Sequence, residues 1–395
     1  MKKFFIAMVA VAALIAFAVP AMAAGSMHVR ALLDVGYTMN SQERTASGDS
    51  VTAVFMNIPG HSYLRGLWMS DDKKAGAHAE LGLNSHAFNG TGSTLRYIYG
   101  WYKIGACKLV AGHTDSTFGS LAYSPFQHVG FGEAKLLLLG WGNAYSGRHP
   151  QVRFEWSGGA FGFSIVAGTP LTVWGLPRVD TGLASVTGFD AATATLVTGS
   201  NITAAVAADQ YAVFPMIDVV LKFKAGGFMT TPGFRWSQLK NKYAAGSLAY
   251  EDTVNSWALH LPVKFAMGAF AVAGQFFYGQ NLNNIIALHR DSVALWNGTS
   301  VLNTKTYGGS IGATFKTGAL KIGVGFGYVR NQNDAWTGAV NDYTSRYAAF
   351  ISARYQVTKN FYVHPEVSYW NYGDSTAGTS NGNEWLLGVQ FGFIF

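Results

Sequence analysis

Hydrophobic residues in this chain recur at every second position of many short segments instead of forming long runs. Leu259 and Leu261, for example, stand on either side of His260. A period of two is typical of a β-strand, because successive side chains of a strand point to opposite faces. Segments of this kind, bounded by Gly, Asn, Asp and Ser, predict about 16 strands. They span residues 27–39, 60–70, 76–84, 93–103, 107–114, 149–157, 161–169, 211–225, 228–240, 253–265, 269–279, 304–316, 320–331, 343–356, 360–372 and 383–395.

The connections between these segments alternate between short and long. The short ones read DKKAG, IGA, GGA, GG, MG, TGA and TKN. The long ones are polar and rich in Gly, Ser and Asn, around residues 40–59, 85–92, 115–148, 170–210, 241–252, 280–303, 332–342 and 373–382. Short turns at one end and long loops at the other are the topology of a single-chain outer-membrane barrel. The pattern therefore predicts an all-β fold, a transmembrane antiparallel β-barrel.

Composition supports a membrane protein that crosses with strands. Hydrophobic residues make up 49% of the chain and charged residues only 12%, about half the charged fraction of a soluble domain. After the first 23 residues no stretch approaches the roughly 18 unbroken apolar residues of a membrane helix. Aromatic residues near strand ends fit the girdles at the two membrane interfaces. The candidates are Tyr37, Trp101, Trp156, Tyr278, Tyr328 and Tyr369.

The first 23 residues have the pattern of a secretory signal peptide. Lys2 and Lys3 precede the apolar run FFIAMVAVAALIAFAVP, and the small-residue site Ala21-Met22-Ala23 follows it. A membrane anchor is the alternative, but the run is short and the cleavage site follows at once. We expect cleavage after Ala23, export across the inner membrane, and a single barrel domain over residues 24–395.

The last ten residues, LLGVQFGFIF, carry a resemblance to a known family. Apolar alternation that ends on Phe391, Phe393 and Phe395 resembles the C-terminal signature read by the outer-membrane assembly machinery. Together with the strand pattern, the whole mature chain resembles the Gram-negative general porins. The segment FFYGQNL resembles homotrimeric porins of sulfate-reducing bacteria.

This resemblance implies a fold, a location and an activity. It implies a homotrimer in outer-membrane lipid, with a water-filled channel for passive diffusion of small hydrophilic solutes and ions. No enzymatic activity and no cofactor are expected. It also implies that the third outer loop, residues 115–148, folds into the lumen as a constriction. An ordinary surface loop is the alternative, although the apolar run KLLLLGW within it suggests packing on the inner wall.

Charged residues predict the lining of the pore. In the constriction loop, Asp115, Glu133, Lys135 and Arg148 are the charges expected to meet solute. On the strands, the alternation places a basic excess inward. The expected lining residues are Arg30, Arg65, Arg96, Arg153, Lys222, Lys264, Arg346 and Arg354, against Glu80, Asp218 and Glu366. Because rings of charge set the sign of the permeant ion, we expect a weak anion preference. The alternative is that these charges pair across strands and cancel.

Several patterns that suggest other chemistry do not fit. The single Cys107 excludes an internal disulfide and a thiolate zinc site, no basic cluster marks a nucleic-acid surface, and no histidine pair predicts a metal site. Gly308-Gly309-Ser310-Ile311-Gly312 matches an esterase pattern, but strand alternation continues through it. GVGFG at 323–327 fails as a phosphate loop for the same reason. Two other functions stay open: a barrel that sheathes a multihaem cytochrome, and an outer-membrane esterase or phospholipase that uses Ser310.

Overall fold

The computed structural model describes most of the chain. The described residues are 25–43, 50–58, 62–83, 95–119, 138, 140–170, 207–212, 214–245, 248–286, 292, 294–296, 301–336 and 339–395. The predicted signal peptide, Glu133 and Lys135 lie outside them, as does most of the long connection 170–210. Within the described part, no helix has the length and apolar character to cross a membrane.

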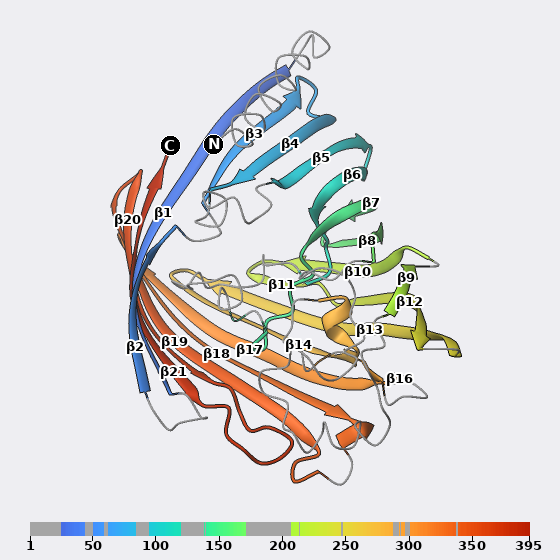
Figure 1. The fold of residues 1–395 in the computed structure, drawn as a ribbon. Helices are drawn as coiled ribbons and strands as arrows, with labels where there is room; N and C mark the ends of the chain where they lie inside the picture. The colour runs from blue at the N-terminus through green and yellow to red at the C-terminus, as the bar shows by residue number, and fades with distance from the viewer. Residues whose placement is uncertain are drawn as a thin grey trace, which may run out of the picture.

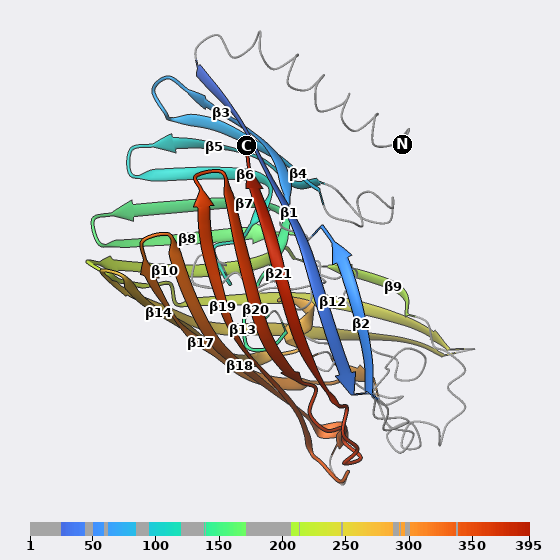
Figure 2. The same ribbon diagram turned by 90° about the vertical axis from the view of Figure 1, so that its left-hand side faces the viewer.

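Nineteen strands form one antiparallel sheet that closes on itself. Closure occurs where β1 (Gly25–Glu43) pairs with β21 (Asn383–Ile394), and Figures 1 and 2 show the resulting ring of tilted strands. The other strands of the sheet are β2 (Ser50–Asn57), β3 (Tyr63–Ser70), β4 (Ala75–Gly82), β5 (Leu95–Ile104), β6 (Cys107–Asp115), β7 (Arg148–Gly158), β8 (Phe161–Gly168), β9 (Ala207–Ala212), β10 (Met216–Ala225), β11 (Phe228–Thr230), β12 (Gly233–Ala245), β13 (Leu248–Met267), β14 (Phe270–Gln280), β17 (Thr304–Thr317), β18 (Leu320–Asn333), β19 (Tyr343–Thr358) and β20 (Phe361–Asn371). A small hairpin, β15 (Leu295–Trp296) and β16 (Val301–Leu302), stands apart from the sheet.

Three barrel strands are interrupted, so the nineteen strands make a 16-strand barrel. β3 and β2 pair with successive halves of β1 and form one interrupted barrel strand. β11 and β12 follow one another along β10, on either side of Thr231 and Pro232. β10 and β9 likewise follow one another along β12. The predicted all-β barrel of about 16 strands is confirmed.

Two strands lie where the sequence predicts loops. β1 continues past Met39 to Glu43 and turns back into β2, with Glu43 opposite Ser50, and β9 ends the connection predicted over 170–210. Apolar alternation marks a strand only where one face meets lipid. Outside the part of the barrel that meets lipid, both faces of a strand can be polar while its backbone hydrogen bonds continue. The sequence of such a strand end therefore shows no alternation of apolar and polar residues.

Side-chain exposure confirms which face of each strand points outward. Leu259 and Leu261 are 50% and 49% exposed, while His260 between them is 4% exposed. Ile351 is 54% exposed and the neighbouring Ser352 is 7% exposed. The exposed face is large and apolar all around the ring, as contact with lipid requires.

The aromatic residues predicted for the girdle lie on the outward face of their strands, except Trp101. Tyr37 is 45% exposed on the outer face. Trp101 instead lies opposite Gly76, on the same face as Glu80, and so points into the lumen. On β5 the outer positions belong to Ile98 and Tyr102, which are 43% and 51% exposed.

The short connections are tight turns, five of which begin with a glycine in the left-handed region. These are Gly105, Gly159, Gly226, Gly268 and Gly318, with φ between 53° and 59°. Only glycine adopts this conformation without steric cost. At all five positions a Cβ would meet open space, so backbone conformation alone explains these glycines.

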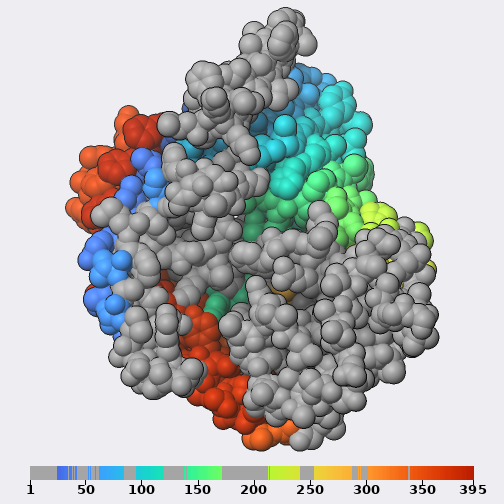
Figure 3. Space-filling model, viewed as in Figure 1, coloured from blue at the N-terminus to red at the C-terminus, as the bar shows by residue number. Residues whose placement is uncertain are grey.

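Buried apolar residues gather inside the barrel and not between layers of sheet. One cluster joins Phe118 and Ala144 to wall residues such as Phe277 and Val329. A second joins Leu138 and Trp141 to Trp370 on β20. Both clusters therefore combine barrel wall with residues of the connection between β6 and β7. In the space-filling view, atoms of the described strands are visible at the left, the upper right and the bottom of the molecule (Figure 3).

Candidate functional site

The described residues of the connection between β6 and β7, 116–119, 138 and 140–147, pack against the inner wall of the barrel. Its first residues are held by two wall strands. Ser116 donates a hydrogen bond through its hydroxyl to Asp218 of β10, and Thr117 is bonded to Ser164 of β8. Phe118 follows and is 1% exposed. The predicted constriction loop thus turns inward as soon as it leaves β6.

A fully buried ion pair anchors this entry point. Arg235 donates two hydrogen bonds to Asp218, from Nε at 2.6 Å and from Nη2 at 2.7 Å, and both side chains are 0% exposed. Its Nη1 donates to the carbonyl of Ile285 at 2.6 Å, and its guanidinium lies 4.9 Å from the ring centroid of Phe118. One arginine therefore holds both the third connection and the segment around the 3-10 helix η3 (Leu282–Asn284).

The returning end of the connection docks on β13 and β14, a few strands further around the barrel. Gln275 of β14 accepts a hydrogen bond from the backbone N–H of Ala144 at 3.0 Å and donates one to Asn143. His260 of β13 lies behind it, with Nε2 at 2.8 Å from the Gln275 Oε1. The two bonds of Gln275 to the connection join residues about a third of the chain apart, so they hold Asn143 and Ala144 on β14.

Two glycine positions allow the connection to lie directly on the wall. A Cβ at Gly327 of β18 would overlap the carbonyl oxygen of Trp141, and one at Gly142 would overlap the backbone of Gly309. Trp141 then packs edge-to-face on Trp370 and Tyr372, with centroids 5.1 and 5.0 Å away. Gly327, the last residue of GVGFG, therefore makes room for the chain itself.

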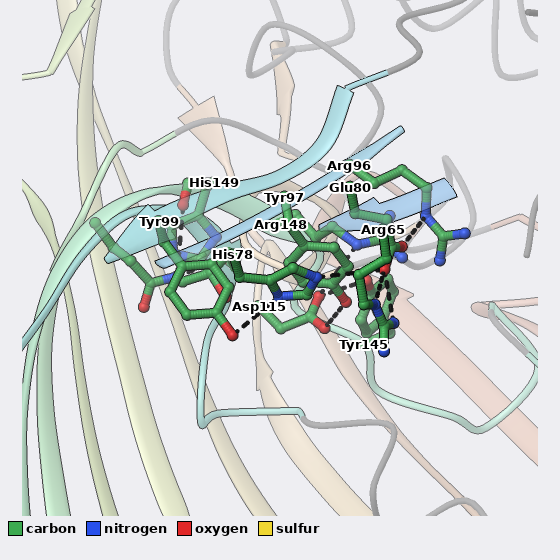
Figure 4. A network of polar contacts seen from close by, with 12 residues as sticks. Arg65, His78, Glu80, Arg96, Tyr97, Tyr99, Asp115, Tyr145, Arg148 and His149 are labelled. Carbon is green, nitrogen blue, oxygen red and sulfur yellow. Dashed lines mark hydrogen bonds and ion pairs between the residues drawn. The ribbon is translucent and has the colours of Figure 1, made fainter. Parts of the chain in front are cut away.

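The base of the connection is an ion pair surrounded by tyrosines (Figure 4). Asp115 and Arg148 were predicted within the loop. They are instead the last residue of β6 and the first of β7, paired directly, with Arg148 Nε 3.6 Å from Asp115 Oδ1. Tyr97 and Tyr145 both donate hydrogen bonds to Asp115. Burial raises the pKa of the Tyr145 hydroxyl, so it remains a proton donor.

A second charged cluster lies on the neighbouring strands. Glu80 of β4 is 1% exposed. Its Oε2 accepts a hydrogen bond from Arg65 Nε at 2.7 Å, and its Oε1 lies 3.1 Å from Arg96 Nε. Arg65 also stands directly opposite Arg30 in the register of β1 and β3. These four residues were all predicted to line the pore, and the barrel brings them together on one wall. Two arginines share one carboxylate, which leaves a positive excess.

The remaining predicted lining residues are spread around the inner face. Arg153 of β7 is paired with Glu155 at 2.6 Å, and Lys108 contacts the same carboxylate at 3.8 Å. Arg346 is 3% exposed, with its guanidinium 5.6 Å from the ring centroid of Trp141. The others, Lys222, Lys264, Arg354 and Glu366, share the inward parity of their strands.

Some residues of this site carry no charge and escaped the sequence prediction. Gln275 and Asn143 form a clamp on β14, and His78, Tyr99 and Trp101 line β4 and β5. The aromatic residues had a usable signal, since they occupy alternate positions of one strand. Nothing in the sequence pairs Gln275 with Asn143.

Patterns that suggested catalysis lie in uninterrupted strands. Ser310 stands in the middle of β17, opposite Gln275 and Gly327. The strained strand-to-helix turn of a nucleophile elbow is therefore absent at Ser310. Among the described residues no group of three or more His, Cys, Asp or Glu could hold a metal ion.

Comparison with known proteins establishes the fold. No protein-family model and no curated protein matches the chain. It is similar to the outer membrane channel DcaP of Acinetobacter baumannii at 15% identity and a TM-score of 0.71, covering 94% of this chain and 98% of that one. It is also similar to OmpF of Salmonella typhi in complex with daunomycin, at 12% identity and a TM-score of 0.55, covering 93% of this chain and 98% of that one. The trimer form of OmpT of Vibrio cholerae matches at 12% identity and a TM-score of 0.54, covering 94% of this chain and 100% of that one.

Proposed function

We propose that this chain is an outer-membrane porin, a water-filled channel for passive diffusion of small hydrophilic solutes and ions. The observation that carries the proposal is a closed barrel whose own third connection is clamped across a lumen lined with polar and charged side chains. Such a lumen sorts solutes by size and charge without making or breaking a bond. The fold shared with an outer membrane channel supports the same activity.

The rival functions fit this lumen less well. A barrel that sheathes a cytochrome would need a wide interior, whereas this one is crossed by residues 140–147. An esterase would need a nucleophile raised out of the wall, whereas Ser310 lies within a flat strand. Unchanged hydrolysis after Ser310→Ala would separate any esterase activity in a preparation from this chain.

We propose a weak preference for anions. Each carboxylate in the described clusters is matched by at least one basic partner, and Glu80 and Glu155 each have two. Among the described residues, no carboxylate lies within ion-pair distance of Lys222 or Lys264. A basic surplus in a narrow lumen raises the local concentration of anions.

Reversal potential under a KCl gradient tests this selectivity. The mature chain refolded into planar bilayers should give a small potential of the sign that favours chloride. Lys222→Gln with Lys264→Gln should move it toward zero, while Lys359→Gln in the β19–β20 turn should leave it unchanged. A potential that favours potassium in the parent protein would overturn the electrostatic proposal and keep the channel.

We also propose that the chain works as a homotrimer in the outer membrane, after removal of residues 1–23. The trimer form of OmpT shows that a barrel of this fold can assemble in threes. Native mass spectrometry of protein extracted from outer membranes tests both points. We expect three copies, each beginning at Ala24. A monomeric native barrel would contradict the assembly, and an intact leader would contradict the processing.

A further inference from the structure

Three aromatic side chains line the lumen along β5. Tyr97, Tyr99 and Trp101 occupy alternate inward positions, and adjacent ring centroids are 6.3 and 5.9 Å apart. Tyr97 is enclosed, because His78 stacks on it at 5.1 Å and the Arg148 guanidinium lies 4.8 Å from its centroid. Tyr99 and Trp101 are only half-buried. They form a ring platform between the base of the third connection and the end of the barrel that carries the short turns.

Glycines on the adjoining strands shape this platform. Gly76 of β4 stands directly opposite Trp101, and a Cβ there would overlap the indole ring. Gly112 of β6 stands opposite Tyr99, with φ of 129°. A Cβ at Gly112 would overlap the backbone of Tyr99. The absence of a side chain at Gly76 lets the Trp101 indole lie against the wall, and the absence of one at Gly112 lets the two backbones approach closely at Tyr99.

Polar groups at the rim of the platform are already paired. The hydroxyl of Tyr99 lies 3.2 Å from His78 Nδ1. Glu155 is held by Arg153 and Lys108, and Lys108 Nζ lies 5.7 Å from the Trp101 ring centroid. Such pairs present both donors and acceptors at fixed positions. The platform is therefore apolar in its middle and rich in hydrogen-bonding groups at its edge.

The face of an aromatic ring also discriminates by charge. Its quadrupole is negative over the face, so an anion gains nothing by lying on Tyr99 or Trp101. A cation that would favour such a face, Lys108, is supplied by the chain itself, with its Nζ 5.7 Å from the Trp101 ring centroid. An uncharged solute with an apolar ring face and a polar rim matches both features. The pyranose ring of a neutral sugar has this form, with C–H groups on its faces and hydroxyls around its edge.

We propose that Tyr99 and Trp101 form a binding subsite for the pyranose ring of a neutral sugar on its way through the lumen. The proposal rests on the channel function, because solute must reach the platform through the pore. It adds a solute class that the charge pattern alone does not give. The sugar would stack on the ring faces and exchange hydrogen bonds with the paired groups at the rim.

Current recordings in planar bilayers with maltose as the probe test this subsite. Maltose should reduce the KCl current in a saturable manner, whereas sorbitol, which has hydroxyls but no ring, should lower it only in proportion to bulk conductivity. Trp101→Ala should raise the half-saturating maltose concentration about two- to tenfold, the loss expected for one ring contact. Trp101→Phe should keep most of the effect.

Tyr102→Ala is the matched control, because Tyr102 is the next residue on β5 and points outward. Its maltose response should equal that of the parent. Equal maltose and sorbitol responses would overturn the proposal, as would a Trp101→Ala channel with unchanged saturation. Saturable block by benzoate but not by maltose would reassign the platform to aromatic anions and also overturn it. Failure of the channel itself would appear separately, as absence of current before any sugar is added.

Discussion

At the scale of single residues, a few side chains decide how the lumen is divided. Asp218 and Arg235 hold the start of the third connection, and Gln275 holds its return. Gly327 contributes by having no side chain, since the connection occupies that space. The dimensions of the lumen therefore depend on contacts that involve little charge exposed to solute.

Removing one partner of the buried pair should destabilise the barrel. Arg235→Met should lower the free energy of unfolding by about 3–5 kcal/mol, because Asp218 would remain as a buried unpaired charge. Urea titration followed by tryptophan fluorescence in lipid vesicles measures this. The double variant Asp218→Leu/Arg235→Met should recover most of the loss. An Arg235→Met barrel as stable as the parent would show that the pair is not an anchor.

Adding a side chain at Gly327 should displace the third connection. Gly327→Val would place atoms where the carbonyl of Trp141 lies, so we expect single-channel conductance to become larger and noisier than in the parent. Gly66→Ala on the outer face is the control, since its Cβ would meet only Met27 at 3.8 Å. If both variants conduct like the parent, the connection does not limit the pore.

The sequence could predict the charged residues of this site but not the hydrogen bonds that hold the third connection on β14. Inward parity placed Arg65 and Glu80 on the lumen face, because they alternate with lipid-facing residues. Arg96 has the parity of the outward Ile98, and the register shift between β4 and β5 at Glu80 and Leu81 brings it to Glu80. Gln275 and Asn143 could not be paired, since a hydrogen bond between segments this far apart leaves no local pattern. The pattern GVGFG was interpreted as a strand segment with its glycines on one face, and nothing in it predicted that the carbonyl of Trp141 fills the space at Gly327.

At the scale of elements, the strand is the unit that the sequence predicts well. All sixteen barrel strands were found from alternation, because a lipid-facing and a lumen-facing side cannot be exchanged without cost. The missed pieces, β2 and β9, lie in segments predicted as polar loops. Strand ends outside the apolar belt are therefore the part of the barrel that pattern alone cannot give.

Two neighbouring positions on β19 provide a test of strand facing. Ile351→Lys puts a charge on the lipid face and should cost about 2–4 kcal/mol of unfolding free energy if it lies near the membrane midplane. Ser352→Lys puts the same charge inside, opposite Glu366, and should cost much less. Equilibrium unfolding in vesicles compares the two. Equal costs would contradict the assigned faces.

At the scale of the whole molecule, closure of the ring between β1 and β21 joins the two ends of the barrel. The backbone of Phe395 makes two hydrogen bonds with Ala31, at 3.2 and 2.9 Å, while its side chain is 71% exposed. The phenyl group of Phe395 therefore contributes little to barrel packing, which is consistent with the predicted role of Phe391, Phe393 and Phe395 as an assembly signal.

Phe395→Ser separates assembly in cells from stability of the barrel. Its backbone bonds to Ala31 remain possible, so refolding in vitro should match the parent, while the amount of folded protein in outer membranes should fall several-fold. Phe315 of β17 is an exposed aromatic residue at the same end of the barrel. Phe315→Ser should change neither refolding in vitro nor the amount of folded protein in outer membranes strongly. Equal outer-membrane levels for the two variants would refute the assembly role.

The most direct test of the central proposal is the single-channel conductance of the refolded mature chain in planar bilayers. A passive, water-filled pore should open in steady steps, grouped in threes if the trimer persists, and the step size should rise in proportion to KCl concentration. A correctly folded barrel that inserts and carries no current would contradict the porin function, and a protein partner inside or beside the barrel would then have to account for its purpose.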